Sequence, residues 1–266
     1  LHSQFGVQTM RSWGIILPMA RADADGQPVE SGPYALHTLG DDETIARLAT
    51  GVKRFSLPDE FNPIVLFKRL AAGESSYAER AHAQLARIFE DRQQYPKAAE
   101  WWRSSLARFK DDRETTKLKR LDQIVGAWGT FEPVTTQGAG LGATVEFRFR
   151  NATEATFTAH AIKVDELLAD VKQYLKSNPR NLEWDRMQID NLGYRLVEQD
   201  QRKYVGEEVA TWSLKLEPRP AHFDRRITVT TPLQKAGAYL VVGTLRDGNT
   251  SRIILWVADT AIVKKQ

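Results

Sequence analysis

The chain has 266 residues, enough for one large domain or two ordinary ones that each bury a core. Hydrophobic residues make up 42% and charged residues 27%, which argues against a disordered or fibrous protein. The net charge of +3 is spread along the sequence, and the densest basic run, Lys117 to Arg120, lies among leucines and beside acidic residues. We interpret that run as a solvated helix face, so no nucleic-acid partner is expected.

The sequence contains no cysteine, which excludes disulfides, thiolate zinc sites, iron–sulfur clusters and cysteine nucleophiles within it. The longest apolar run near the start, Trp13 to Met19, is too short to span a bilayer and is interrupted by Gly14 and Pro18. No membrane span is therefore expected. The chain begins at Leu1 rather than at Met, which indicates a processed form or a piece of a longer protein.

The amino-terminal part combines a loop with helical patterns. Ala20 to Pro33 is polar and rich in turn formers, which predicts a surface loop. From Asp41 onward, apolar residues recur at helical spacing, which predicts two helices separated at Pro58. Their predicted apolar faces are Ile45, Leu48 and Val52 in the first helix, and Phe61, Ile64, Phe67 and Leu70 in the second.

A clearer helical pair follows. Ser76 and Glu79 have the spacing of a capping box, which predicts that a helix starts there and runs to about Arg92. Pro96 suits the first turn of the next helix. The predicted apolar faces are Ala81, Leu85, Ile88 and Phe89 in one helix, and Ala98, Ala99, Trp102, Leu106 and Phe109 in the other.

This pair resembles a tetratricopeptide repeat, in which small residues let two helices approach while aromatic residues fill the angle between them. The pattern departs from the repeat at His82, Gln93 and Lys110. A further helix over 113–124 is expected to close the array, so we predict that residues 1–126 form a helical, tetratricopeptide-like region. The positions that match the repeat are Leu85, Ala86, Phe89, Tyr95, Ala98, Trp102 and Leu106.

From Trp128 onward the hydrophobic period changes to two, which predicts half-buried antiparallel strands. Asp247-Gly248-Asn249 lies between two such runs and predicts a hairpin whose turn needs positive φ angles at Gly and Asn. Val164 to Leu175 has the spacing of an amphipathic helix inserted among the strands, expected over a sheet edge or one end. Leu182 to Val197 fits either a helix or a strand. We predict a multidomain α plus all-β chain, with an antiparallel β-sandwich over residues 127–266.

At the carboxyl end, Thr231 to Val241 contains Gly237-x-Tyr239, and Thr250 to Lys264 ends in Val257-x-Asp259-x-x-Ile262-Val263-Lys264. These two stretches resemble the closing strands of a macroglobulin domain of bacterial α2-macroglobulin-like proteins. In that family a strand with Gly-x-Tyr pairs with a strand that ends in Val-x-Asp-x-x-Ile/Val-Val-Lys, and Thr231 to Val241 followed by Thr250 to Lys264 matches this order. Trp128 to Pro133 and Ile227 to Leu233 resemble large members in which helical repeats precede the domain. The residues that carry the motif are Gly237, Tyr239, Trp256, Asp259 and Lys264.

The resemblance implies protease trapping, in which several macroglobulin domains frame a bait segment and many members hold a Cys–Gln thioester. This chain has no cysteine and so cannot contain that thioester. It would supply frame and docking surface to a periplasmic, cell-surface or secreted protein. Its partners would be other domains of the parent chain, proteases or a peptide segment.

Enzyme chemistry would need a nucleophile with a base, a metal cluster or a phosphate loop. Gly138 to Gly142 precedes a strand rather than a helix, so it does not fit a phosphate loop. Glu183, Asp185 and Asp190 lack regular spacing and are interpreted as solvated charge. We expect no enzyme, no cofactor and no metal site. The histidines, His2, His37, His82, His160 and His222, are scattered without metal-ligand spacing.

Two functions from different classes remain open. The first is a scaffold within a protease inhibitor, and the second is an adaptor whose helical groove binds a peptide or a partner protein, with the β domain as a spacer. A hydrolase is the weakest alternative. Trp102 is expected in the core of the repeat and Trp101 at its half-exposed rim.

Overall fold

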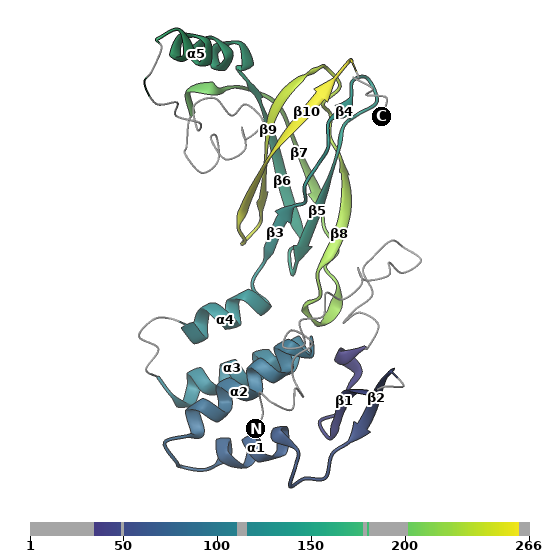
Figure 1. Ribbon diagram of the computed structural model, residues 1–266, viewed down its shortest axis with the longest axis vertical. Coiled ribbons are helices and arrows are strands. Elements are labelled where there is room, and N and C mark those ends of the chain that lie inside the picture. The colour runs from purple at the N-terminus through teal and green to yellow at the C-terminus, as the bar shows by residue number, and fades with distance from the viewer. Residues whose placement is uncertain (1–34, 49–50, 111–115, 178–179, 181–201, 261–266) are drawn as a thin grey trace. The chain divides into compact units, whose positions relative to one another are not determined.

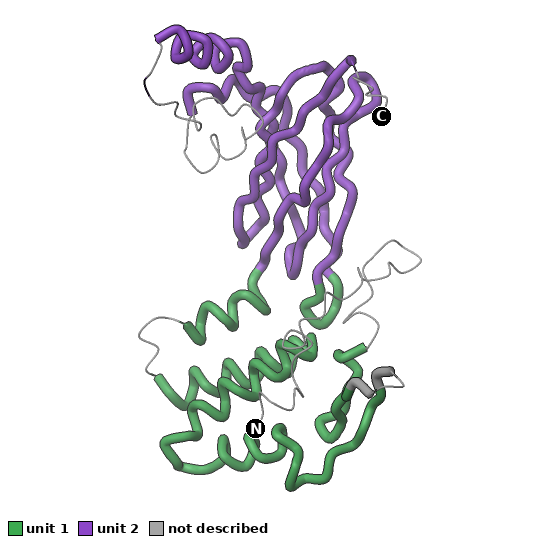
Figure 2. The backbone as a smooth tube through the Cα atoms, viewed as in Figure 1, with its two compact units in different colours: residues 1–126, 219–223 green, residues 127–218, 224–266 purple. Residues whose placement is uncertain are grey.

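The computed structural model describes residues 35–48, 51–110, 116–177, 180 and 202–260. The chain divides into two compact units, which Figure 2 shows in different colours. Unit 1 comprises Leu1–Gly126 with Arg219–Phe223, and unit 2 comprises Ala127–Pro218 with Asp224–Gln266. No described helix is long and apolar enough to cross a membrane.

Unit 1 is built mainly from four helices in which each packs on the next along the chain (Figure 1). Their amphipathic faces meet in one apolar core centred on Leu85, Phe89 and Trp102, each at most 2% exposed. The periodicity therefore placed the two central helices and their buried faces correctly. The helices are α1 (Pro63–Ala72), α2 (Ala78–Asp91), α3 (Tyr95–Arg108) and α4 (Thr116–Val125).

The first predicted helix of unit 1 is wrong. The segment instead forms an antiparallel hairpin of β1 (Glu43–Leu48) and β2 (Gly51–Ser56), after a short 3₁₀ turn at Leu36–Thr38. β-branched Thr44 and Ile45 lose side-chain freedom in a helix, and Gly51 would cost about 1 kcal/mol there relative to Ala. Strand pairing satisfies the same backbone groups without those costs, and Ile45 is still buried.

Helix α2 also starts differently from the prediction. Tyr77 occupies the position before the helix without a side-chain cap bond, while Glu79 forms an ion pair with Lys117. The predicted capping box is therefore absent, because Glu79 pairs with α4. A side-chain cap occurs instead at α1, where Asn62 Oδ1 accepts from the Ile64 amide at 2.9 Å.

Unit 2 is a β-sandwich of two sheets. One sheet has the order β3-β5-β8 and the other the order β4-β10-β9-β6-β7, with every pair antiparallel except β4 with β10 (Figure 1). Helix α5 (Val164–Lys176) follows β6, as predicted. The strands are β3 (Trp128–Phe131), β4 (Gln137–Gly138), β5 (Thr144–Arg150), β6 (Glu154–Ile162), β7 (Val205–Lys215), β8 (Arg225–Thr230), β9 (Gly237–Leu245) and β10 (Thr250–Ala258).

Phenylalanines from both sheets meet in the sandwich core. The rings of Phe131 and Phe157 lie 5.1 and 5.4 Å from the ring of Phe147, in edge-to-face contacts. Two glycines make room for them. A Cβ added at Gly129 would lie 2.6 Å from Phe147 Cζ, and one at Gly243 would lie 3.0 Å from Phe131 Cζ.

The predicted hairpin of β9 and β10 is present, but its turn works differently. Asp247 has the positive φ of 57°, whereas Gly248 and Asn249 are not among the positive-φ residues. Gly248 is needed for close approach, since an added Cβ would lie 2.8 Å from the Ala127 carbonyl oxygen. The loop at 20–33 and the ambiguous segment 182–197 lie outside the described residues.

The outer face of the five-stranded sheet carries a second apolar cluster that includes α5. Leu167 of α5 packs with Ile162 and Leu240, and all three are nearly inaccessible to solvent. Asp170 fastens the helix further, because it accepts hydrogen bonds from Tyr204 Oη at 2.8 Å and from Lys203 Nζ at 2.6 Å. The predicted inserted helix is thus anchored to the sheet.

We expect Tyr239→Asp to unfold unit 2 while the helical signal of unit 1 persists. Tyr239 is 8% exposed on β9, so a carboxylate there costs on the order of 3 kcal/mol or more. Circular dichroism during thermal unfolding measures this loss. Thr244→Asp, an exposed position on the same strand, is the control and should leave the strand signal unchanged. Retained strand content in Tyr239→Asp would contradict the assigned core position.

Candidate functional site

The residues that match the tetratricopeptide pattern lie inside unit 1. Leu85, Ala86, Phe89, Ala98 and Trp102 are at most 2% exposed, while Tyr95 and Leu106 are half-buried. The indole Nε1 of Trp102 donates to Glu90 Oε1 at 2.5 Å. These side chains hold α2 against α3 and leave little surface for a ligand, so their role in this structure is packing.

The macroglobulin-like motif lies on the hairpin of β9 and β10. Tyr239 pairs with Leu255 and points into the sandwich core, whereas Trp256 belongs to the outer cluster beside α5. Gly237 begins β9 and Asp259 follows β10, while Lys264 lies outside the described residues. The structure brings the first part of the motif together as a hairpin rather than as a chemical site.

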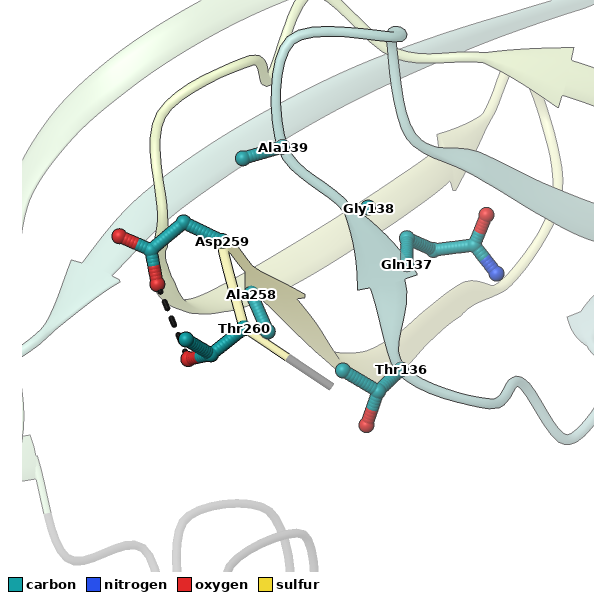
Figure 3. Close-up of a pocket in the computed structure, with 7 residues that line it drawn as sticks. All are labelled: Thr136, Gln137, Gly138, Ala139, Ala258, Asp259 and Thr260. Atoms are coloured by element: carbon teal, nitrogen blue, oxygen red, sulfur yellow. Dashed lines mark hydrogen bonds between the residues drawn. The ribbon is translucent and has the colours of Figure 1, made fainter. Parts of the chain in front are cut away.

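An open groove of about 700 Å³ lies where β4 meets β10 (Figure 3). Asp259 Oδ1 accepts from Thr260 Oγ1 at 3.2 Å, and the Gln137 side chain donates to the Thr135 carbonyl oxygen at 3.2 Å. In Figure 3 the side chains of Gln137 and Asp259 point away from each other. The groove thus presents a carboxylate that is hydrogen-bonded to a threonine hydroxyl, and an amide directed elsewhere. Its lining is Thr136, Gln137, Gly138, Ala139, Ala258, Asp259 and Thr260.

A buried polar cluster fastens the segment before β1 to the helices of unit 1. Arg92, 1% exposed, donates to the carbonyl oxygens of Gly40 at 2.9 Å and Glu43 at 2.7 Å. Gln94 donates to the carbonyl oxygen of Leu39 at 2.6 Å. Burial lowers the pKa of Arg92, and the nearby charges of Asp41 and Glu43 oppose this shift. A guanidinium stays protonated in proteins. The cluster is structural, because both terminal nitrogens of Arg92 and the Gln94 amide nitrogen donate to backbone carbonyl oxygens. Arg92 Nε and Gln94 Oε1 are buried without a hydrogen-bond partner among the described residues.

Other ionisable groups with displaced pKa values also join elements. Burial alone would raise the pKa of Asp41, but hydrogen bonds from Lys68 at 2.6 Å and Lys97 at 2.7 Å outweigh it and hold the pKa below 3.8. The bonds that Lys203 makes with Asp170 and Tyr204 raise its pKa above 10.5. None of these groups lines the groove of Figure 3.

The remaining candidate residues stay apart. His82 is buried with Nδ1 2.9 Å from the Ala78 carbonyl oxygen, while His37, His160 and His222 lie on different elements. Within the described residues, no group of three acidic or histidine side chains is placed to hold a metal ion. Gly138–Gly142 connects β4 to β5, as the predicted inter-strand loop. His2, Glu183, Asp185 and Asp190 lie outside the described residues.

An exposed apolar surface on α1 was missed by the sequence interpretation. Phe61, Leu66 and Leu70 are 69%, 40% and 44% exposed, whereas Ile64 is fully buried. Phe61 and Leu66 occupy the positions of a hydrophobic staple, and Leu70 follows Leu66 by one turn. We call these three residues the α1 stripe. The apolar period included Phe61 and Leu70 in the predicted apolar face, but within α1 only Ile64 and Ala71 are buried.

No known protein family and no curated protein matches the sequence. Among solved structures, native α2-macroglobulin from Escherichia coli spanning domains MG0-NIE-MG1 is similar at 14% identity and a TM-score of 0.35, over 53% of this chain and 42% of that one. The native conformation of the E. coli protein aligns at 17% identity and a TM-score of 0.28, over 50% of this chain and 8% of that one. A CARDB domain from Pyrococcus furiosus aligns at 10% identity, with a TM-score of 0.24, over 50% of this chain and 87% of that one.

We expect Asp41→Asn to remove part of the acid sensitivity of unit 1. Because the folded-state pKa of Asp41 lies below 3.8, its stabilisation is present above the unfolded value and disappears as the pH falls through the folded value. The side chain is partly exposed, so the effect stays below about 1 kcal/mol. Urea unfolding of the unit 1 helices measures how the free energy of unfolding changes with pH. Measurements from roughly pH 6 to pH 2.5 cover the titration of the carboxyl group. The exposed neighbour change Asp42→Asn is the control, and equal pH curves for both variants would contradict the assignment.

Proposed function

We propose that the chain is a non-catalytic scaffold that frames and binds other protein segments. One observation carries this proposal: the buried polar groups and the charged groups named below join one structural element to another. Arg92, Gln94 and Asp41 tie one segment of unit 1 to the helices, and Asp170 ties α5 to unit 2. Polar side chains that join elements stabilise a rigid frame, whereas catalytic side chains must contact a substrate in a cleft.

We further propose that this frame belongs to a bacterial α2-macroglobulin-like protein located outside the cytoplasm. The support is the sequence pattern at the carboxyl end, together with the hairpin on which Gly237, Tyr239 and Trp256 lie. By that resemblance the parent protein would trap proteases. The chain would contribute docking surface to other domains of the parent, with the trapping chemistry elsewhere.

The purified chain is expected neither to cleave nor to inhibit proteases. Incubation with trypsin and a fluorescently labelled protein substrate, which a trapped protease cannot reach, measures inhibition, with a serum α2-macroglobulin preparation as the positive control. A fluorogenic peptide without trypsin measures cleavage by the chain itself. Stoichiometric loss of protease activity would contradict the scaffold function, because inhibition would then need no other domain. Hydrolysis of the peptide without trypsin would contradict the non-catalytic assignment.

A second candidate function is an adaptor, and the α1 stripe favours it. Its apolar side chains at i and i+4 spacing suit the apolar face of an amphipathic helix from a partner protein. Salt bridges of Lys68 with Asp41 and of Arg69 with Asp59 flank the stripe and supply a polar rim.

We expect Leu66→Asp and Leu70→Asp to abolish selection of helical peptides from a displayed library while they change stability by less than about 1 kcal/mol. Both side chains are substantially exposed, so a carboxylate disturbs binding more than folding. Leu141→Asp, at an 87% exposed position of unit 2, is the matched control and should select the same peptides as the unmodified chain. Peptides that bind all three variants equally would rule out the stripe as their site.

A further inference from the structure

The two sheets of unit 2 end in four edge strands, namely β4 and β7 on one sheet and β3 and β8 on the other. An edge strand presents backbone N–H and C=O groups that can pair with another chain. Folded proteins therefore shorten, bulge, charge or cover their edges. Among the described strands, three of these four edges are covered, shortened or bulged, whereas β8 carries only charge, at Arg225 and Arg226.

The edge of β3 is covered by side chains of the β9–β10 hairpin. The Asn249 side chain accepts from the Gly129 amide and donates to the Gly129 carbonyl oxygen, both at 2.8 Å. Ser251 Oγ accepts from the Phe131 amide at 3.2 Å. The backbone N–H and C=O groups of alternate residues point toward the paired strand. Because Glu132 N donates to Glu146 O, the backbone groups of Gly129 and Phe131 point away from β5.

The two edges of the other sheet are blunted in different ways. β4 has only two residues, Gln137–Gly138. β7 is longer, but its pairing with β6 shifts register twice, which leaves Val209 opposite no residue of β6 and bulges the strand again near Gly206. Glu207 and Glu208 add exposed charge at the bulges.

β8 differs from these three edges. It pairs with β5 in an unbroken register from Arg225 to Thr230. Thr231 N donates to Ala143 O at 2.8 Å, so by alternation the backbone groups of Thr228 and Thr230 point toward the open edge. Both threonines are exposed, while Val229 between them is buried in the core.

We propose that β8 pairs antiparallel with β8 of a second copy of this chain. A twofold contact must be self-complementary, and an arrangement with Val229 on the twofold axis places Thr228 of each copy opposite Thr230 of the other. Threonine pairs are favourable across strands, and this register keeps Arg225 and Arg226 of the two copies from facing each other. The Val229 side chains would extend the two sandwich cores toward each other.

The contact is small. It offers on the order of four backbone hydrogen bonds and less than the roughly 1,000 Å² typical of stable interfaces. We therefore expect reversible, concentration-dependent association of the whole chain rather than a permanent dimer. Sedimentation equilibrium over a concentration series measures the dissociation constant.

Two double variants test the proposed register, because they are expected to change the strength of association in opposite directions. In Thr228→Lys with Thr230→Lys, like charges face each other across the contact and should weaken association. In Thr228→Lys with Thr230→Asp, each lysine faces an aspartate and association should strengthen. Two cross-strand pairs of this kind should separate the two dissociation constants by roughly tenfold. Both variants change the same exposed positions, so a folding defect would show equally in thermal unfolding of each.

Cross-linking reads the register directly, because the chain has no native cysteine. An oxidised mixture of Thr228→Cys and Thr230→Cys chains should give disulfide-linked dimers, whereas either variant alone should give far fewer. A chain that stays monomeric at every concentration would overturn the proposal. So would association with equal constants for the two double variants. Binding of an unrelated Thr/Val-alternating peptide by a monomeric chain would assign the edge to another protein's strand and also overturn the second copy as its occupant.

Discussion

The close approach of β3 to the β9–β10 hairpin is the constraint on which unit 2 depends. It is possible because Gly129 and Gly243 lack side chains where the rings of Phe147 and Phe131 lie. Because the strands lie close together, the Asn249 side chain hydrogen-bonds both backbone groups of Gly129. It thereby makes the hydrogen bonds that a neighbouring strand would otherwise make. The same glycines therefore allow the aromatic core to fill and one side of the sandwich to close.

In unit 1 a buried charged side chain, rather than a glycine, allows two segments to pack together. The segment before β1 leaves carbonyl oxygens that must be satisfied when it packs on the helices. Arg92 satisfies Gly40 and Glu43, and Gln94 satisfies Leu39. A buried guanidinium is costly unless it is hydrogen-bonded, and the terminal nitrogens of Arg92 meet this need by donating to the backbone while Nε has no partner among the described residues.

Sequence reasoning predicted the elements whose pattern is local and missed those set by distant contacts. The amphipathic faces of α2, α3 and α5 follow from spacing along one helix, and the β9–β10 hairpin follows from one turn. The hairpin at 43–56 was mistaken for a helix, because Ile45, Leu48 and Val52 have helical spacing and strand pairing overrides this local pattern.

The exposed and edge features were missed for a similar reason. A short apolar period does not show which side chains of α1 are buried, so Phe61 and Leu70 of the α1 stripe were placed on the same predicted apolar face as Ile64. The bulges of β7 and the role of Asn249 depend on register between segments far apart in sequence. The tetratricopeptide interpretation rests on residues that are mostly buried, so it concerns packing more directly than function. Of the macroglobulin motif, Tyr239 is buried, whereas Gly237 and Asp259 are exposed.

Two surface features of the chain suit association with other protein segments. Exposed apolar side chains gather on α1, and one sheet edge keeps a regular backbone while the others are blunted. Both features increase the risk of aggregation, and neither is needed for the stability of an isolated domain. A regular edge and an apolar helix face are instead useful where other chains or domains supply the missing strand or helix. This is the physical reason for regarding the chain as a frame, with binding distributed over its surface and not gathered in a cleft.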